Sequence, residues 1–87
     1  MGPNDSMRVS PAPPDPPYTK RYAYDGANNL EYEGWVKTSA NAATSDAAWA
    51  IKRYSYDGAN KLTAEQFADG NNAEDNVWDN RAALSYS

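Results

Sequence analysis

One phrase of eleven residues occurs twice in the chain, as KRYAYDGANNL at residues 20–30 and as KRYSYDGANKL at residues 52–62. Nine of the eleven positions are identical, and the two copies begin 32 residues apart. In each copy an Asp-Gly pair, which is typical of tight turns, separates two stretches of strand-like composition. A catalytic site is not duplicated in this way within 87 residues, but a turn can be. The repeat therefore predicts two β-hairpins of the same construction.

Alternating polar and apolar residues predict four strands, at residues 18–24, 30–37, 49–56 and 62–68. We expect hairpin loops of about four to six residues between the paired strands. We attribute the turns to Gly26 and Gly58, because glycine adopts positive φ without steric cost. In the second predicted strand, alternation places Val36 on one face and Trp35 on the other.

The segments outside these strands are expected to be less regular. Residues 38–48 are small and polar, and they are interpreted as a connecting loop in which Ser45 or Asp46 caps a short helical turn. Residues 74–82 are predicted to form one short helix or an irregular turn, followed by a terminal strand.

The composition of residues 18–87 points to an aromatic core. This part of the chain holds all three tryptophans, all seven tyrosines and the single phenylalanine, but few aliphatic residues. Aromatic rings bury a large area each and suit pleated surfaces. A chain of 87 residues has room for one domain. The expected fold is therefore all-β: a small antiparallel sheet or sandwich of four or five strands, with two hairpins and an optional short C-terminal helix.

All six prolines lie in the first 17 residues, five of them in the run SPAPPDPPY. Proline fixes φ and keeps its predecessor extended, so residues 1–17 are expected to form an extended arm. The arm is either a linker or disordered tail, or a segment that becomes ordered against a partner or a neighbouring subunit. In the second case the predicted partner-binding residues are Met7, Val9, Pro11, Pro13, Pro14, Pro16, Pro17 and Tyr18.

The composition disfavours several classes of function. The chain contains neither histidine nor cysteine, which removes the commonest general base and the commonest transition-metal ligands. The formal net charge is −4 and the eight basic residues are scattered, so nucleic acid is not an expected partner. No apolar run reaches membrane-spanning length, and we expect no membrane contact and no signal peptide. We therefore expect no cofactor and no enzymatic activity.

Some polar side chains are nevertheless candidates for chemistry. Glu31 and Glu33 come closest to a catalytic pair, but they share one strand face, where solvated charges are the simpler interpretation. Residues 69–75 are rich in carboxylates and amides but do not match the spacing of an EF-hand loop. A looser calcium site and a turn whose side chains bind backbone amides are the alternatives there.

Aromatic and arginine side chains leave further alternatives open. Tyr22 and Tyr24 point to one face of their predicted strand, as do Tyr54 and Tyr56 in the second copy. Such rings either stack on a sugar or pack in the core. Arg81 follows aromatic and apolar residues, where a guanidinium stacks on a ring, binds a carboxylate or remains at the surface.

Two resemblances to known families bear on these expectations. The stretches YAYDGANNL and YSYDGANKLTAEQFADG are similar to the YD-repeat unit of Rhs-type proteins, which build β-shells from many tandem hairpins. Two copies cannot make such a shell, so this likeness implies hairpin chemistry alone. Over most of residues 18–87 the chain resembles short structural proteins of tailed bacteriophages. The elements that carry this resemblance are Trp49-Ile51-Arg53, Ala68-Asp69-Gly70 and Trp78-Asp79-Asn80-Arg81.

The phage resemblance implies a non-enzymatic virion protein that is made in the cytoplasm of the bacterial host. The expected partners are other virion proteins of the capsid or of the tail and its fibres, together with further copies of the same chain. Decoration or attachment would be its role. The alternative expectation is a carbohydrate-binding module that recognises a bacterial surface glycan through exposed tyrosine and tryptophan side chains.

Overall fold

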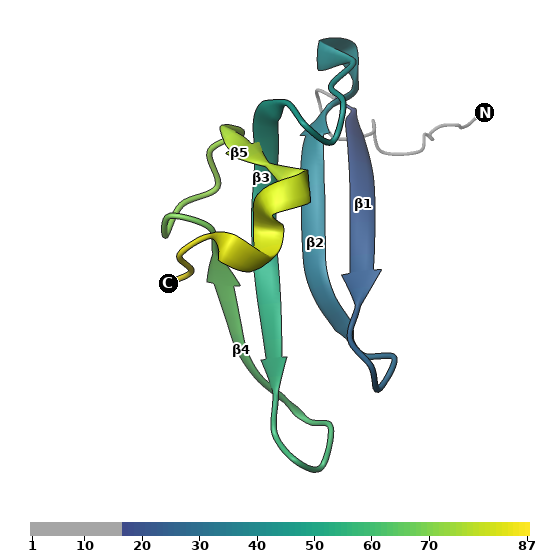
Figure 1. Cartoon of the computed structure of the whole chain (residues 1–87), viewed down its shortest axis with the longest axis vertical. Helices are drawn as coiled ribbons and strands as arrows, with labels where there is room; N and C mark the ends of the chain where they lie inside the picture. Colours follow the sequence, from purple (N-terminus) through teal and green to yellow (C-terminus); the bar gives the residue numbers. More distant parts are fainter. Residues whose placement is uncertain (1–16) are drawn as a thin grey trace, which may run out of the picture.

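The computed structural model describes residues 17–87 and contains a five-stranded antiparallel sheet, drawn in Figure 1. The four longer strands lie side by side in chain order, and the short β5 pairs with β3. The strands are β1 (Tyr18–Tyr24), β2 (Leu30–Lys37), β3 (Ala47–Tyr56), β4 (Leu62–Phe67) and β5 (Asn76–Val77). Two 3-10 helices, η1 (Thr38–Ala40) and η2 (Trp78–Ala83), complete the elements. The predicted all-β fold of four or five strands is confirmed.

The predicted strand ends next to the two repeated loops are confirmed, and the other boundaries differ in part. β1 and β2 have the predicted limits, whereas β3 begins two residues earlier and β4 ends one residue earlier than expected. The helical turn after β2 lies at Thr38–Ala40 and not at Ser45 or Asp46. The Asp46 carboxylate instead accepts a hydrogen bond from the Ala43 amide, which closes a non-helical turn. The predicted terminal strand is reduced to one bridge between Ala68 and Tyr86.

The two copies of the repeated phrase build the same loop. In the first copy, Oδ1 of Asp25 accepts hydrogen bonds from the backbone amides of Ala27 at 2.8 Å and Asn29 at 2.9 Å. Asp57 does the same for the residues two and four positions after it, at 2.8 and 3.0 Å. The side chain of each aspartate thus binds amides that the sheet leaves without partners.

The positive φ in these loops belongs to asparagine, so the prediction that glycine supplies it is wrong. Asn28 has φ 65° and Asn60 has φ 62°, whereas Gly26 and Gly58 are not in the positive region. The hydrogen-bond pattern is that of a three-residue loop, in which an ordinary turn is followed by one left-handed residue. Asparagine tolerates that conformation because its short amide side chain binds locally.

Exchanging residues within the second loop tests this assignment. Asn60→Ala should lower the free energy of unfolding by about 1 kcal/mol, because a Cβ-bearing residue without a local hydrogen bond is disfavoured there. A Cβ at Gly58 would meet no atom within 4 Å, so Gly58→Ala should leave stability unchanged or raise it by roughly 0.4–1 kcal/mol. Urea denaturation of the two variants measures both effects. A larger loss for the glycine variant would contradict the loop assignment.

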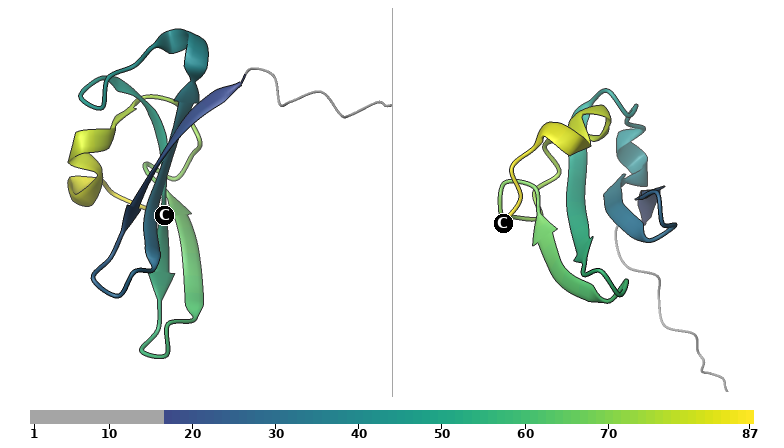
Figure 2. Two further views of the ribbon diagram at one scale, coloured as in Figure 1. Left: turned by 90° about the vertical axis from the view of Figure 1, so that its right-hand side faces the viewer. Right: turned by 60° about the horizontal axis from the view of Figure 1, so that its bottom comes forward.

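The hydrophobic core lies on one face of the sheet only. Figure 2 shows residues 78–87, which we call the C-terminal segment, crossing this face, while no described element covers the other. Trp49 and Trp78 are buried here with their ring centroids 6.2 Å apart. The remaining buried members of the core cluster are Val36, Ile51 and Ala68. The buried Asn76 side chain donates to the Trp49 carbonyl at 3.0 Å, so no polar group is stranded where β5 meets β3.

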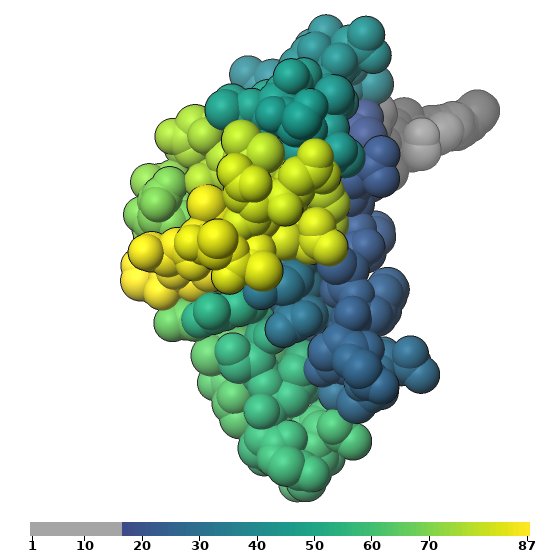
Figure 3. All heavy atoms as spheres, in the orientation of Figure 1, coloured from purple at the N-terminus to yellow at the C-terminus, as the bar shows by residue number. Residues whose placement is uncertain are grey.

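Two arginines attach the C-terminal segment to the sheet by stacking. The Arg81 guanidinium lies 4.7 Å from the Trp78 ring centroid and 5.8 Å from that of Tyr32. Of the alternatives for Arg81, stacking on a ring is therefore the one observed. The Arg53 guanidinium lies 4.7 Å from the Tyr86 ring centroid. These contacts place planar cations against ring faces, which is favourable where water is partly excluded. Figure 3 shows this segment, in yellow, across the middle of the molecule, while the two hairpins extend beyond it at the bottom of the view.

Candidate functional site

The face of the sheet opposite the C-terminal segment is the strongest candidate site, and we name it the uncovered face. Strand pairing sets one row across it, because Tyr22 pairs with Glu33, Glu33 with Lys52 and Lys52 with Phe67. Successive side chains of a strand alternate between faces, so the neighbours of the core residue Val36 point away from the core. The uncovered face comprises Tyr18, Lys20, Tyr22, Tyr24, Glu33, Trp35, Ala50, Lys52, Tyr54, Glu65 and Phe67.

An edge-to-face pair of rings forms the centre of the uncovered face. The ring centroids of Trp35 on β2 and Phe67 on β4 are 5.9 Å apart, and the ring planes meet at 82°. Between them, on β3, stands Ala50, whose small side chain lets the two rings meet across the strand. Ala50 has no exposed surface, although no element of residues 17–87 covers this face. Ring pairs of this geometry contribute roughly 0.5–1.5 kcal/mol beyond their buried area.

Charged side chains of both signs surround these rings. Glu33 accepts a hydrogen bond from the Tyr54 hydroxyl at 2.6 Å and pairs with Lys20 at 3.3 Å. Lys52 pairs with Glu65 at 2.7 Å, and its ammonium lies 5.5 Å from the Phe67 ring centroid. Burial, followed by the hydrogen bond to Glu33, raises the pKa of Tyr54 well above its usual range. The polar groups are thus held in fixed positions while both charge signs remain available at the rim.

A shallow groove of about 350 Å³ lies on the uncovered face, between side chains of β1, β2 and β3. Three tyrosines of β1 are exposed, and one of them, Tyr18, lines this groove. The exposed fractions of Tyr18, Tyr22 and Tyr24 are 38%, 49% and 62%. Of the two alternatives stated for Tyr22 and Tyr24, packing in the core is therefore not the one observed, and Trp49 and Trp78 occupy the core instead. The groove is lined by Tyr18, Lys20, Glu33, Trp35 and Lys52. This arrangement can stack on planar or ring-shaped groups and can bind charged ones, but it offers no enclosed reaction chamber.

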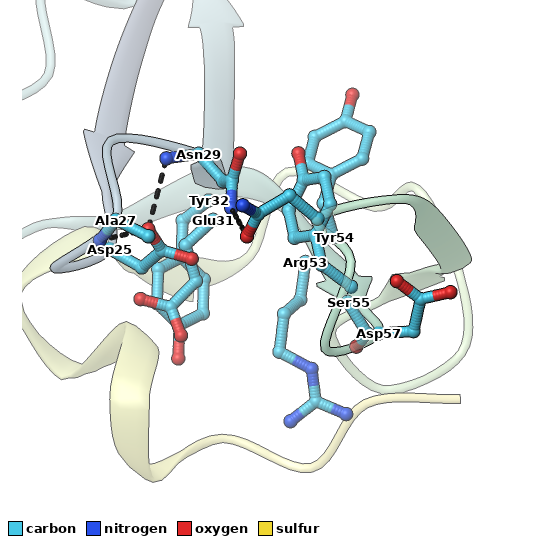
Figure 4. A pocket seen from close by; sticks show the side chains of 11 residues that line it. Asp25, Ala27, Asn29, Glu31, Tyr32, Arg53, Tyr54, Ser55 and Asp57 are labelled. Atoms are coloured by element: carbon cyan, nitrogen blue, oxygen red, sulfur yellow. Dashed lines mark hydrogen bonds between the residues drawn. The ribbon is translucent and has the colours of Figure 1, made fainter.

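A second and more polar pocket, of about 530 Å³, lies between the two repeated loops and appears in Figure 4. The side chains that line it come from both hairpins, and the Asn29 amide donates to the Asn60 side-chain oxygen at 3.1 Å. The Tyr56 hydroxyl donates to the Leu30 carbonyl at 2.7 Å. Asp25 and Asp57 line it too, but each directs one carboxylate oxygen at its own loop. We interpret this pocket as the junction of the two hairpins.

The predicted partner-binding residues fall only partly within the described chain. Met7, Val9, Pro11, Pro13, Pro14 and Pro16 lie outside the described residues. Pro17 is exposed, and its carbonyl accepts a hydrogen bond from the Thr38 amide at 3.0 Å. Tyr18 lines the groove. The predicted partner-binding residues do not include four members of the uncovered face, Lys20, Trp35, Lys52 and Phe67. For Trp35 the signal was present, because alternation places it opposite a core valine.

The other candidate groups find structural partners. Glu33 is bound to Lys20 and Tyr54 and lines the groove, whereas Glu31 lines the pocket between the two repeated loops, so the two carboxylates do not share one cavity. In the turn after β4, Oδ1 of Asn71 accepts from the Ala73 amide at 2.9 Å, as the polar-turn alternative requires. Residues 17–87 contain no group of three or more Asp, Glu, His or Cys side chains that could hold a metal ion.

The stability of the fold should decline above pH 10. Burial raises the pKa of the Tyr86 phenol from 10.0 to about 12. Between these values the unfolded chain releases a proton that the folded chain keeps, so stability is complete below pH 10 and is lost as pH rises through the interval. Denaturation midpoints measured at rising pH should therefore fall, and Tyr86→Phe should flatten this fall. Tyr24→Phe, at an exposed ring, is the control, and an unchanged slope in Tyr86→Phe would contradict the assignment.

Comparison with known proteins adds no relatives to this picture. No protein-family model matches the chain, and neither a curated protein nor a solved structure matches it. Within residues 17–87, no helix has the length and apolar character needed to cross a membrane.

Proposed function

We propose that the chain is a non-enzymatic structural protein that binds a neighbouring protein through the uncovered face. The single observation that carries this proposal is that the sheet keeps one face free of any described element while holding exposed aromatic rings there. Aromatic residues are enriched at protein interfaces, because they contribute a large contact area and lose little conformational entropy on binding.

The physical state of the uncovered face favours a role in recognition. Trp35 is held by its contact with Phe67, and Tyr54 is held by its hydrogen bond to Glu33. Side chains that are already fixed lose less freedom when a partner binds, so more of the contact energy appears as affinity. The lysines and glutamates around the rings would fix the orientation of a bound partner and exclude partners whose charges do not match, because placing like charges together is costly.

The setting we propose is a phage virion, with decoration of the capsid or attachment to the tail or its fibres as the role. The likeness of the Trp49-Ile51-Arg53 and Trp78-Asp79-Asn80-Arg81 elements to structural proteins of tailed phages supports this setting. A small domain without cysteines, and therefore without disulfides, gains stability from assembly, which fits a component of a large particle.

Incorporation into particles tests the proposal. Virions assembled with Tyr22→Thr/Tyr24→Thr in place of the wild-type chain should contain much less of it, because the exposed rings contribute contact area to the partner. Both changes keep a good strand former at an exposed site, so the fold should persist. Ala82→Ser/Ala83→Ser, on the exposed side of η2, is the matched control and should be incorporated normally.

Quantitative mass spectrometry of purified particles measures the copy number, and thermal unfolding confirms that both variants are folded. Equal copy numbers for the two variants would contradict a role for the uncovered face. Absence of the wild-type chain from purified particles would contradict the virion setting.

A carbohydrate-binding module is the second candidate, because Tyr22 and Tyr24 are exposed two residues apart on one strand. Side chains at this spacing point to the same face and lie roughly 6.5–7 Å apart along the strand, which suits two adjacent sugar rings. A glycan array with the wild-type chain separates the two candidates. Binding that Tyr22→Thr abolishes in a folded chain would favour the glycan, whereas a lack of binding to any glycan would leave the protein partner.

A further inference from the structure

The proline-rich segment of the chain has the chemistry that the groove on the uncovered face would bind. We propose that residues 11–17 of one copy bind the uncovered face of a second copy. This inference rests on the proposed function, since it names an occupant for the same surface. It converts the uncovered face from a general binding surface into the docking site of a defined peptide.

Residues 11–17 read PAPPDPP, a sequence suited to the polyproline II helix. That helix has three residues per turn, so residues three apart share one edge. Pro11, Pro14 and Pro17 form one edge, and Pro13 and Pro16 form a second. Two of the three edges are therefore purely proline, whichever way the segment turns. Peptides of this kind dock into grooves lined by aromatic side chains, because they are preformed and lose little entropy.

The uncovered face offers such a groove at a suitable scale. Its lining includes the rings of Tyr18 and Trp35, and Trp35 is fixed by Phe67. Four adjacent strands span roughly 14–15 Å at their usual spacing. A seven-residue polyproline II segment spans roughly 20 Å. The segment is therefore long enough to cross β1 to β4 and to place prolines between the rings.

The charges are also complementary. The one charged residue within the segment is Asp15. Two lysines, Lys20 and Lys52, line the groove, and the Lys20 side chain is 49% exposed even while it pairs with Glu33. Asp15, near the middle of the segment, can therefore approach either lysine of the groove. Such a charge pair helps to fix the position of the segment along the groove.

The geometry favours a second copy over the segment's own domain. The Pro17 carbonyl is bound to the Thr38 amide, so the chain enters β1 at that end of the sheet. To lie across its own groove the segment would have to turn sharply immediately before Pro17. Asp15 and Pro16 each precede a proline, which favours extended conformations at both. A sharp turn at these positions is thus disfavoured, whereas the groove of another copy requires none.

The test compares the full wild-type chain with a full-length variant in which three of the five prolines of residues 11–17 are replaced, Pro13→Ala/Pro14→Ala/Pro16→Ala. We call it the proline variant. Light scattering after size exclusion should give the wild type a mass of more than one chain at high concentration. The proline variant should give the mass of one chain. A synthetic peptide of residues 8–17, titrated into the ¹⁵N-labelled proline variant, should then shift the indole N–H signal of Trp35 and leave those of Trp49 and Trp78 in place.

Trp35→Phe in the proline variant assigns the Trp35 signal, and Trp35→Ala should abolish peptide binding. If the peptide leaves the Trp35 signal unmoved at saturation, the proposal is overturned, even where the wild type associates through another surface. A wild type that stays monomeric at all concentrations while the peptide still binds would overturn docking between copies in favour of docking within one chain. Neither result bears on particle incorporation, which separately decides whether the uncovered face binds a different protein.

Discussion

Replacing Gly34 with alanine should lower the free energy of unfolding by about 1–3 kcal/mol, the usual cost of forcing an extra group into a packed core. A Cβ at this position would lie 2.6 Å from Cε3 and 2.7 Å from Cζ3 of Trp78, and 3.5 Å from Cε3 of Trp49. The Trp78 ring cannot yield easily, because it is buried and packs against Trp49. Glycine at this point of β2 is thus what allows the C-terminal segment to lie flat on the sheet.

Gly26→Ala is the matched control, since a Cβ there would meet no atom within 4 Å. Urea denaturation should separate the two alanine variants clearly. A second check uses a smaller residue at the contact: in a Trp78→Leu background, Gly34→Ala should cost less than in the wild type, because the added methyl group then has room. Equal losses for the two glycine sites, or no coupling to Trp78, would contradict the packing described.

Removing the Trp78 ring should have the largest effect of any change considered. Trp78→Ala should cost about 3–5 kcal/mol, the range measured for large aromatic residues in cores. It removes the partner of Trp49, the ring on which Arg81 stacks and the cover over Gly34. Small domains are stable by about 5–15 kcal/mol in total, so this variant should lose a large fraction of its free energy of unfolding.

Trp35→Ala provides the contrast, since this tryptophan lies on the uncovered face and is only half-buried. It should lose the contact with Phe67 and the cover over Ala50, and it should cost clearly less than Trp78→Ala. Circular dichroism during denaturation measures both variants. If the two substitutions were equally destabilising, the uncovered face would be part of the core, and the distinction between a folding face and a binding face would fail.

The hairpins could be predicted from the sequence because their determinants are local. The period of two in β1 and β2 and the repeated Asp-Gly pair sufficed to place the strands. Which residue of each loop adopts positive φ could not be predicted in the same way. An Asp-Gly pair occurs three times, but only Gly70 has positive φ, at 72°, because the loop type and not the dipeptide decides which residue turns.

The C-terminal segment could not be predicted to the same degree. A short helix and an irregular turn were the alternatives for residues 74–82, and the chain adopts a two-residue strand followed by a 3-10 helix there. Trp78 decides the outcome, because its ring must reach the space above Gly34. That contact joins residues far apart in the sequence, and no pattern within one segment contains it. For the same reason the pairing of Trp35 with Phe67, which depends on a small residue on β3, was not predictable.

The most direct measurement is hydroxyl-radical footprinting of the chain, free in solution and within purified virions. We expect Tyr22, Tyr24 and Trp35 to be labelled in the free chain and strongly protected in the particle. Leu84 and Tyr86, which are partly exposed on the opposite side of the sheet, serve as an internal control and should be labelled similarly in both states. Equal labelling of the three rings in the two states would contradict the central claim, because the uncovered face would then have no partner in the assembled particle.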